Sequence, residues 1–378
     1  MAELGETPKG SRVHVAFFGL RNAGKSTLVN AFTGQDIAIV SDVAGTTTDP
    51  VSKAMEILPL GPCLVTDTAG LDDTGSLGEM RVDKTLRVLS TTDIAVWVTG
   101  DGEESGAEAR ARFDAECRRR GVTVLEYRRG DSVEALKTKI ASVKLADVPP
   151  GLLDGLAKAG DRVVCVCPID ESAPKGRLIL PQVQLIRECL DIGAWCAVCQ
   201  PRELPDVLRS VRCDLVVTDS QAFGEVRDAV KVMPDGARPS LTSFSILFAR
   251  QKGDLAEYLK GLDAIRSLKD GDRVLVAEGC THHRQCNDIG TVKIPKALSR
   301  MSGRKLEFSF ASGGSFGFED GSRPALVVHC GGCMLTRREV MRRIAVCREA
   351  DVPVVNYGML LAAAHGLRGV MPNGLVDP

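Results

Sequence analysis

A glycine-rich turn between an apolar run and a helical segment constrains the start of this chain more than any other feature. The apolar run is Val13–Phe18, and the turn after it, Gly19–Ser26, matches the pattern Gly-x-x-x-x-Gly-Lys-Ser. A helix is expected at once, from Ser26 to Phe32. In this strand–loop–helix context, backbone N–H groups of the loop face phosphate oxygens and the helix N-terminus adds its positive dipole end. The sequence therefore predicts an α/β unit that binds a nucleotide through its phosphates.

The side chains predicted to serve a nucleotide lie in this loop and in two later segments. Lys25 would reach the β- and γ-phosphates, and Ser26 would bind Mg²⁺. A threonine of the loop 45–49 would contact Mg²⁺ and the γ-phosphate, and the strand end at 64–70 would add an Mg²⁺-shell carboxylate and a γ-phosphate N–H. The predicted nucleotide-binding residues are Gly19, Asn22, Ala23, Gly24, Lys25, Ser26, Thr27, Thr47 and Asp67. The predicted catalytic residues are Asn22, Lys25, Thr47, Asp67 and Gly70, of which Asn22 and Thr47 are chosen through the resemblance described next.

With these segments the chain resembles a TrmE-type small GTPase. The asparagine within the loop, Asn22, together with the Gly45–Asp49 segment, narrows the resemblance. In that family the asparagine implies a potassium ion that supplies the charge an arginine finger supplies elsewhere. Asn22 would then help to hold K⁺, and Thr47 would be the switch threonine. A turn-forming asparagine without an ion is the alternative interpretation.

One expected GTPase segment is absent. GTPases read guanine with an Asn-Lys-x-Asp segment after the fifth strand, and no such segment occurs in the chain. After the run 94–98 we expect a helix at 107–120, a strand at 122–126 and a helix that ends at Ala141, which leaves room for one strand–helix unit where a complete domain has two. Arg128–Asp131 could be a degenerate base reader, but we favour loss of the whole unit. Guanine selection and GTP hydrolysis are therefore both left open.

Two groups of soft ligands lie in the last third of the chain, each directly after a short apolar run. These ligands are Cys280, His282, His329, Cys330 and Cys333. The preceding runs, 274–277 and 325–328, are short and aliphatic, as buried parallel strands are. Because ligands gather at the carboxyl ends of the strands in an open α/β sheet, we expect the two groups to meet there.

The residue types in these two groups indicate a metal centre. Thiolates select iron–sulfur clusters, zinc or copper(I). Three cysteines and one histidine would satisfy a closed structural zinc site. The ligands lie at strand ends beside glycines rather than in a small knuckle, and three cysteines with a weaker fourth ligand also suit a 4Fe–4S cluster with one exchangeable iron. The residues alone leave both metal centres open.

Between these two regions the chain reads as a second α/β domain, which begins after Pro149-Pro150-Gly151. We expect strands at 162–167, 194–199, 215–218 and 241–248, and helices at 182–190 and 204–211. Such alternation predicts a parallel, helix-covered sheet with a structural or dimerisation role. Cys196 and Cys199 form a Cys-x-x-Cys within a strand, so we interpret them as core thiols rather than a ligand pair. The charged loop 168–177 is either solvated surface or a functional loop.

Composition excludes several classes of protein. The net charge is −1 and aromatic residues make up 4% of the chain, so neither the charge nor stacking surfaces favour nucleic acid or an anionic membrane. No apolar run approaches the length of a spanning helix, and residues 1–12 lack the apolar stretch of a signal peptide. The 13 cysteines without an export signal argue for reduced thiols and a cytoplasmic location.

As a whole, the chain resembles the FeFe-hydrogenase maturation GTPase family, HydF. The similar stretches are Gly19–Thr27, Val43–Pro50, Ala173–Gln182, Leu215–Gln221, Glu278–His282, Asp288–Pro295, His329–Cys333 and Asn356–Gly358. The resemblance implies that Cys280, Cys330 and Cys333 bind a 4Fe–4S cluster, with His282 and His329 at or near the open iron. It lapses at about 101–160, and Ala69 stands where the family usually has proline.

The resemblance also implies a role. A protein of this family binds GTP with Mg²⁺, receives a diiron subcluster precursor made with two radical-SAM enzymes, and transfers it to apo-hydrogenase, as a homodimer. The fold expected is α/β: a shortened P-loop domain at 1–147, a dimerisation domain at 148–266 and a cluster domain at 267–378, the last two with parallel sheets. The alternative function is a regulatory P-loop NTPase with a structural Cys/His zinc site.

Overall fold

The computed structural model describes most of the chain. The described residues are 9–34, 50–72, 82, 85–100, 106–145, 149–169, 176, 178–279, 288–313, 316, 318, 323–332, 334–367, 369–371 and 373–376. They divide into two compact units, 1–148 and 149–378. Among the helices described, none is long and apolar enough to cross a membrane.

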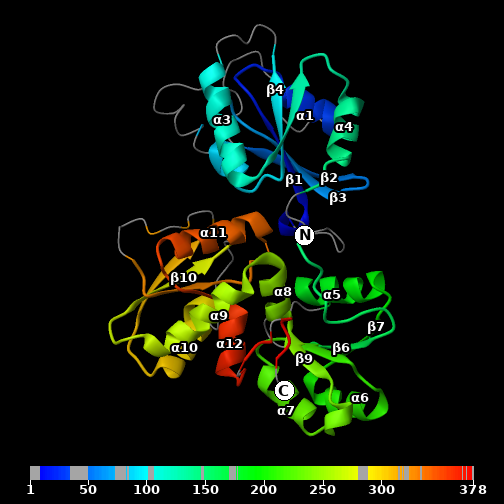
Figure 1. The fold of residues 1–378 in the computed structure, drawn as a ribbon, viewed down its shortest axis with the longest axis vertical. Helices are drawn as coiled ribbons and strands as arrows, with labels where there is room; N and C mark the ends of the chain where they lie inside the picture. Colours follow the sequence, from blue (N-terminus) through cyan, green and yellow to red (C-terminus); the bar gives the residue numbers. More distant parts are fainter. Residues whose placement is uncertain are drawn as a thin grey trace. The chain divides into compact units, whose positions relative to one another are not determined.

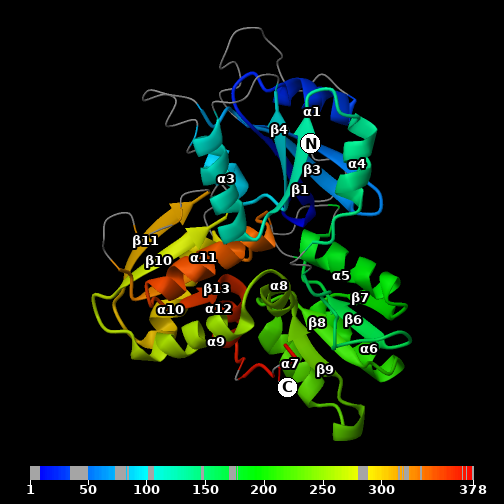
Figure 2. The ribbon, with the colours of Figure 1, turned by 45° about the horizontal axis from the view of Figure 1, so that its top comes forward.

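The first unit is a five-stranded sheet between helices (Figures 1 and 2). Its strands are β1 (Val13–Phe18), β2 (Val51–Ile57), β3 (Gly61–Asp67), β4 (Ile94–Thr99) and β5 (Thr123–Arg128), in the order β2-β3-β1-β4-β5. Its described helices include α1 (Lys25–Thr33), α3 (Ala107–Arg120) and α4 (Val133–Ala141). Only the β2–β3 pairing is antiparallel. The strand at 13–18 and the helix at 107–120 lie where the sequence predicts them.

Alternation along β1 supplies a core to each face of this sheet. Successive side chains of a strand point to opposite faces. Phe17 packs edge-on against Phe32 of α1 with ring centroids 5.5 Å apart, whereas Phe18 packs against Phe113 of α3 at 5.2 Å. Leu136 of α4 joins the core on the α1 side. Each buried phenylalanine contributes about 1.5–3 kcal/mol, so β1 is anchored from both faces and fixes where its last residue presents the loop.

The second unit contains two four-stranded sheets with the same strand order. The first contains β6 (Arg162–Val166), β7 (Trp195–Cys199), β8 (Leu215–Thr218) and β9 (Ser240–Ser243), in the order β7-β6-β8-β9. The second contains β10 (Arg273–Glu278), β11 (Glu307–Ser312), β12 (Leu326–His329) and β13 (Val354–Asn356), in the order β11-β10-β12-β13. Every pairing in both sheets is parallel, as the sequence predicts for this part of the chain.

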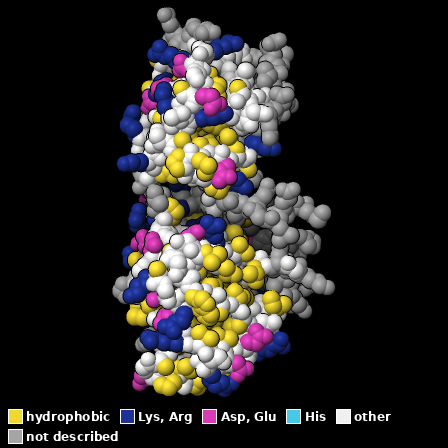
Figure 3. Space-filling model, turned by 90° about the vertical axis from the view of Figure 1, so that its right-hand side faces the viewer, with side chains coloured by type: hydrophobic (Ala, Val, Ile, Leu, Met, Phe, Trp, Pro, Cys, Tyr) yellow, Lys and Arg dark blue, Asp and Glu magenta, His cyan; other side chains and the backbone are white. Residues whose placement is uncertain are grey.

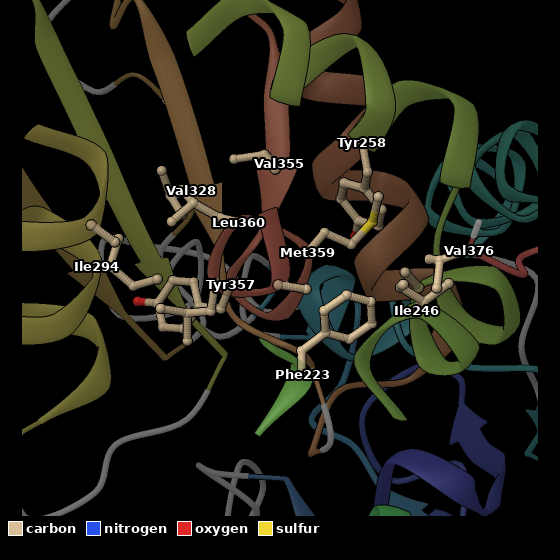
Figure 4. Close-up of a cluster of buried hydrophobic side chains, with 14 of the residues drawn as sticks. Phe223, Ile246, Tyr258, Ile294, Val328, Val355, Tyr357, Met359, Leu360 and Val376 are labelled. Carbon is tan, nitrogen blue, oxygen red and sulfur yellow. The ribbon is translucent and has the colours of Figure 1, made fainter. Parts of the chain in front are cut away.

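Helices cover both sheets of the second unit. They are α5 (Leu180–Asp191), α6 (Leu204–Ser210), α7 (Phe223–Lys231), α8 (Phe244–Lys252), α9 (Leu255–Ala264), α10 (Ile294–Ser302), α11 (Arg337–Glu349) and α12 (Tyr357–Ala364). One hydrophobic core continues from the first sheet to the second. Figure 4 shows Phe223 of α7 and Ile246 of α8 in this core with Tyr258 of α9, Val328 of β12 and Met359 of α12. Packing of this kind makes residues 149–378 one compact body.

One predicted strand is wrong. The apolar run 241–248 is a short strand, β9, followed by the helix α8. The division falls at Ser243, whose hydroxyl caps the helix by accepting a hydrogen bond from the Ile246 N–H at 3.3 Å. Most of the run is buried, and periodicity cannot separate a buried strand from a buried helix. The serine was the available signal, because serine is a preferred N-cap residue.

The free edge of the first sheet carries exposed apolar side chains. β7 lies at this edge, and Trp195 and Val198 are each 47% exposed. On the neighbouring helix α5, Val183 and Leu190 are also exposed. Figure 3 shows hydrophobic side chains grouped on the side of the molecule where Figure 1 places α5 and β7. Exposed apolar patches of this kind typically mark association surfaces.

Candidate functional site

The first site begins where β1 ends. Gly19 follows the strand with φ +153°, and a Cβ there would lie 2.4 Å from the Val98 carbonyl oxygen, so only glycine fits. Asn22 and Gly24 both have positive φ, 58° and 90°, which bends the loop back onto the start of α1 at Lys25. Within the predicted nucleotide set Ala23 is buried, whereas Asn22 and Thr27 are exposed.

Lys25 lies inside the loop rather than on its surface. Its side chain is buried, and Nζ donates hydrogen bonds to the Leu20 carbonyl at 2.6 Å and to the Gly19 carbonyl at 3.3 Å. An ammonium group held against the loop backbone is the positive charge that a polyphosphate in the loop would meet. The geometry follows from Lys25 being the first residue of α1, directly beneath the turn.

Asp67 and Ser26 meet beside this lysine. Asp67 ends β3, is fully buried, and accepts a hydrogen bond from the Ser26 hydroxyl at 2.6 Å. Burial raises the pKa of Asp67, although the Ser26 hydrogen bond and the nearby Lys25 ammonium oppose the rise. Within the described part of the chain its second oxygen, Oδ1, has no hydrogen-bond partner. A buried, unsatisfied carboxylate oxygen beside a hydroxyl fits a divalent cation such as Mg²⁺.

The segment after Asp67 is tied to the phosphate loop. Thr68 donates to the Phe17 carbonyl at 2.7 Å, and the Leu71 N–H donates to the Gly19 carbonyl at 3.2 Å. A Cβ at Gly70 would lie 2.9 Å from the Arg21 backbone nitrogen, so a side chain there would push the two segments apart. Thr47 lies outside the described residues.

Asp131, the candidate guanine reader, accepts a hydrogen bond from a neighbouring backbone N–H. Its Oδ2 accepts a hydrogen bond from the Arg128 N–H at 2.9 Å, and its carbonyl accepts one from the Tyr127 hydroxyl at 2.9 Å. The carboxylate therefore closes the turn between β5 and α4. β5 lies at the edge of the described sheet, and α4 packs in the same core as α1.

The second site lies at the carboxyl ends of β10 and β12. These strands are neighbours, and β10 is also paired with β11 on its other side. After β10 the chain therefore adds β11 on one side of it and then β12 and β13 on the other side, which makes the boundary between β10 and β12 a topological switch point. Such a switch point leaves a crevice at the strand ends where α/β sheets bind ligands. The Gly279 N–H, one residue before Cys280, donates to the Cys330 Sγ at 3.1 Å. Gly279, the residue that directly precedes Cys280 in the chain, therefore contacts the Cys330 sulfur at this crevice.

The structure describes only part of this ligand set. Cys330 and His329 are described, whereas Cys280, His282 and Cys333 are not. No group of three or more metal-ligating side chains occurs within the described ranges. The Cys330 backbone is fixed by its N–H, which donates to the Ala277 carbonyl at 2.8 Å. An N–H donated to a cysteine sulfur stabilises a thiolate, which is the form that ligates a metal.

A buried ionic network lies behind Cys330. Arg343 of α11 is 1% exposed, and its guanidinium donates to Glu339 at 2.8 Å, to the Gly313 carbonyl at 2.7 Å and to His329 Nε2 at 3.3 Å. Burial and the Arg343 charge lower the pKa of His329 to about 4, so the ring is neutral at pH 7. Burial opposes ionisation of Glu339, but Arg342 and Arg343 hold its pKa below the ordinary value.

Residues that the sequence analysis did not select hold the loop that follows Cys330. Lys252 of α8 is buried and donates to the carbonyls of Gly332 and Leu335 at 3.4 and 3.2 Å. Arg337 reaches back from α11 to the Gln251 carbonyl at 2.7 Å. The Glu339–Arg343 pair could have been found from its i,i+4 spacing, if a helix had been predicted for this segment. Lys252 could not, because nothing in its local sequence marks it as buried.

Comparison with known families decides the identity of the second unit. The model described as "Hydrogen maturase F dimerization domain" matches residues 152–253, and "Hydrogen maturase F tetramerization domain" matches residues 256–372. Together they match more than half of the chain. The chain belongs to the hydrogen maturase F family. This maturase also carries a GTPase domain, since the model described as "50S ribosome-binding GTPase" matches residues 14–125.

Curated relatives of this maturase match in the GTPase domain. A tRNA modification GTPase MnmE of Zymomonas mobilis is 40% identical over 94 residues, which cover 25% of this chain and 21% of that protein. GTPase Der of Wolinella succinogenes is 41% identical over 99 residues, covering 25% of this chain and 20% of that protein. The chain thus spans about a fifth of the length of each of these two relatives.

Solved structures are similar at low identity. Era of Aquifex aeolicus is 16% identical, with 79% of this chain and 93% of that chain covered and a TM-score of 0.28. Toc33 of Arabidopsis thaliana is 18% identical, with 34% and 57% covered and a TM-score of 0.25. Scores this low do not establish a shared overall structure.

Proposed function

We propose that this maturase is a scaffold that assembles and delivers part of the hydrogenase active site. Its second unit carries a 4Fe–4S cluster on Cys280, Cys330 and Cys333, with His282 as a further candidate ligand. It receives a diiron subcluster precursor from two radical-SAM enzymes and transfers it to apo-hydrogenase. The cluster, when bound, supplies an iron with an exchangeable coordination position. The single observation that supports the proposal is the hydrogen bond from the Gly279 N–H to the Cys330 sulfur, because Gly279 directly precedes Cys280 in the chain.

The donor set fits this cluster chemically. Three thiolates leave one iron of a 4Fe–4S cluster without a cysteine ligand. Cys330 lies at a switch point between parallel strands and its sulfur already accepts a backbone N–H, as cluster sulfurs commonly do. The protein's own contribution is to hold the thiolates at the strand ends and to keep the loop between Cys330 and α11 in place through Lys252.

Metal content is the deciding test of the scaffold function. The protein is purified anaerobically and reconstituted, and iron, sulfide, zinc and the EPR spectrum after dithionite reduction are measured. About four irons per chain with an S = 1/2 signal are expected, as for a single 4Fe–4S cluster. One zinc and no cluster signal after reconstitution would support the alternative, a zinc-stabilised regulatory NTPase. Full hydrogenase maturation by a Cys280/Cys330/Cys333→Ser variant would also contradict the proposal.

In the GTPase domain, we propose that GTP and Mg²⁺ bind at the phosphate loop. The nucleotide would lie against Gly19, Ala23, Gly24 and Thr27, with Lys25 on the phosphates. Mg²⁺ would take the unpartnered Oδ1 of Asp67 together with the Ser26 hydroxyl, and Thr47 and Gly70 would contact the γ-phosphate. Lys25→Ala should weaken nucleotide binding at least a hundredfold, about 2.7 kcal/mol. Binding within a few fold of the parent protein would contradict this assignment.

Nucleotide selection and turnover form a separate part of the proposal. Because the Asp131 carboxylate serves the Arg128 N–H, the base has no identified reader among the described residues, so GTP and ATP should bind with similar affinity. A hundredfold preference for GTP would show that another group reads guanine. Asn22 would hold K⁺ in the loop. Hydrolysis should then be faster in KCl than in NaCl, and Asn22→Ala should remove the difference.

Three functional segments follow from these assignments: the GTPase domain at 1–147, a dimerisation domain at 148–266 and the cluster domain at 267–378. The free edge at β7, with Trp195 and Val198 exposed, is the proposed contact between two copies. Nucleotide state would alter contacts with a partner, and the cluster domain would hold and release the precursor. We propose that the protein works in the cytoplasm, where thiols stay reduced.

A further inference from the structure

Arg343 is the largest fully buried side chain of the described residues. A guanidinium taken out of water is costly unless its N–H groups and its charge are satisfied. Glu339, four residues earlier on the same face of α11, supplies the charge through a 2.8 Å hydrogen bond. The Gly313 carbonyl accepts at 2.7 Å, and the Phe316 ring lies under the guanidinium, 5.0 Å from its centroid. The remaining partner of the arginine is His329.

The two partners of His329 together fix its tautomer. A backbone carbonyl can only accept, so the 2.6 Å contact between Nδ1 and the Cys330 carbonyl requires a proton on Nδ1. A guanidinium can only donate, so the 3.3 Å contact between Arg343 Nη1 and Nε2 requires a lone pair on Nε2. Both ring nitrogens of this buried histidine therefore have partners, and the nitrogen that would otherwise bind a metal faces a cation.

We infer that Arg343 is a positioning residue that keeps His329 off the iron and turns it into a support for Cys330, an inference that rests on the proposed cluster. The His329 ring holds the Cys330 carbonyl, the Ala277 carbonyl holds the Cys330 N–H, and the Gly279 N–H meets the sulfur. Cys330 is thus held at its carbonyl, at its N–H and at its sulfur. The fourth iron position is left to His282 or to a ligand that arrives with the cargo.

The network also explains why His329 stays in this role. If Nε2 turned to an iron, Arg343 would lose one of its acceptors while remaining buried, and the Cys330 carbonyl would lose its donor. Arg343 cannot follow, because Glu339 and the Gly313 carbonyl hold its other nitrogens. The arrangement joins the ends of β11 and β12 to α11, so it is built into the sheet and does not depend on the loop that carries Cys280.

Electron–nuclear spectroscopy of the loaded protein tests whether His329 binds iron. In a His282→Gln/His283→Gln protein, His329 is the remaining histidine adjacent to a cluster cysteine. After reconstitution and reduction, pulsed EPR should detect no histidine nitrogen coupled at the strength of an iron ligand. Adding Arg343→Gln should release Nε2 and make such a coupling appear. A strong coupling before that change, lost on adding His329→Gln, would overturn the inference.

A matched control separates positioning from general destabilisation. Arg342 shares Glu339 with Arg343, and among the described residues its side-chain hydrogen bonds, both 2.8 Å long, go to Glu339 rather than to His329. Arg342→Gln should leave the nitrogen signal and the reduced-cluster spectrum as in the parent double variant. Equal nitrogen signals in Arg342→Gln and Arg343→Gln would show that Arg343 has no particular hold on His329, and would overturn the inference.

A second measurement needs no cluster. Solid-state ¹⁵N NMR of the apoprotein, labelled at the histidine rings, distinguishes the two neutral tautomers, and a His329→Gln difference spectrum assigns the signal. The Nδ1-protonated form is expected in the parent protein and in Arg342→Gln, with a mixture in Arg343→Gln. An Nε2-protonated ring in the parent protein would overturn the inference. Failure of the protein to load a cluster would instead count against the proposed function, so the two failures are distinguishable.

Discussion

The two sheets of the second unit have the same strand order but differ in where their cysteines lie. Both have four parallel strands in the order second-first-third-fourth. In the first sheet Cys165, Cys196 and Cys199 lie within strands, whereas in the second sheet Cys330 follows the end of β12. Cys165 and Cys196 face one core with their sulfurs 3.6 Å apart, and Cys199 faces the other. In the second sheet Cys330 follows β12 and meets Gly279 at the switch point.

The difference teaches that the groups packed around a cysteine sulfur decide its chemistry, more than its position along a strand. A side chain inside a strand of a covered parallel sheet is surrounded by apolar neighbours. The hydrogen bond with Cys196, and then burial, raises the pKa of the Cys165 thiol, and burial raises the pKa of Cys199 to about 11.

Cys167, one residue past β6, is also buried, and burial raises its pKa to about 12. Cys330, one residue past β12, differs because its sulfur accepts a hydrogen bond from the Gly279 N–H. A Cys-x-x-Cys pattern is therefore informative only when the groups around its sulfurs are known.

The largest expected effect separates these two groups of cysteines. Cys330→Ser should remove the cluster, reducing the iron content from about four per chain to near background, because a three-thiolate site cannot lose one ligand without losing the cluster. Cys196→Ser, the matched control in the first sheet, should load iron normally. Iron and sulfide analysis after reconstitution measures both. Loss of the cluster in Cys196→Ser would break the comparison.

The second effect concerns the free edges of the two sheets. Trp195→Glu on β7 should weaken dimerisation about thirtyfold or more, since buried tryptophans at interfaces contribute 2 kcal/mol or more. Phe310→Glu on β11 is the matched change on the other sheet, where Phe310 is 43% exposed. It should leave dimers and lower the share of tetramers, following the descriptions of the two matching domains. Sedimentation analysis measures both, and unchanged dimerisation in Trp195→Glu would refute the β7 contact.

A smaller effect is expected at Lys252, which holds the loop between Cys330 and α11. Lys252→Met should lower the free energy of unfolding by about 1–3 kcal/mol, because the carbonyls of Gly332 and Leu335 lose a buried donor. The control is Lys260→Met on α9, where the Lys260 side chain is exposed to solvent and pairs with Glu257 at 2.8 Å. It should change stability by less than about 0.5 kcal/mol. Urea titration compares the stabilities of the two variants, and equal effects would mean that the hydrogen bonds of Lys252 add no stability.

The smallest effect is a shift in thiol reactivity in the first sheet. Hydrogen bonds from Cys165 and then Cys189 lower the pKa of Cys196. A lowered pKa keeps the thiolate as the pH falls, so alkylation of Cys196 by iodoacetamide should slow less between pH 8 and pH 6 than the roughly tenfold per unit of an ordinary thiol. Cys165→Ala should restore the ordinary slope. Mass spectrometry of the labelled peptides measures the rates, and identical slopes in both proteins would contradict this thiol pairing.

Local sequence was sufficient for much of the fold. The phosphate loop was predictable because its glycines, lysine and flanking apolar run act within one strand–loop–helix unit. The strands at 215–218 and 274–277 were predictable because aliphatic runs of that length fit a covered parallel sheet. The run 241–248 was not, since a uniformly buried segment carries no period and its division depends on what packs around Ser243.

The sequence by itself determined the phosphate loop, and it predicted a metal site in the same chain, because both sets of residues are specified by motif and spacing. Only the tertiary structure decided what surrounds them. It showed Asp131 bonded to its own turn, His329 held between Arg343 and a carbonyl, and Lys252 beneath the loop of Cys330. Each of these depends on hydrogen bonds whose partners are set by packing. Spacing along the chain predicts which residues can reach a site, but burial decides which atoms remain free to act there.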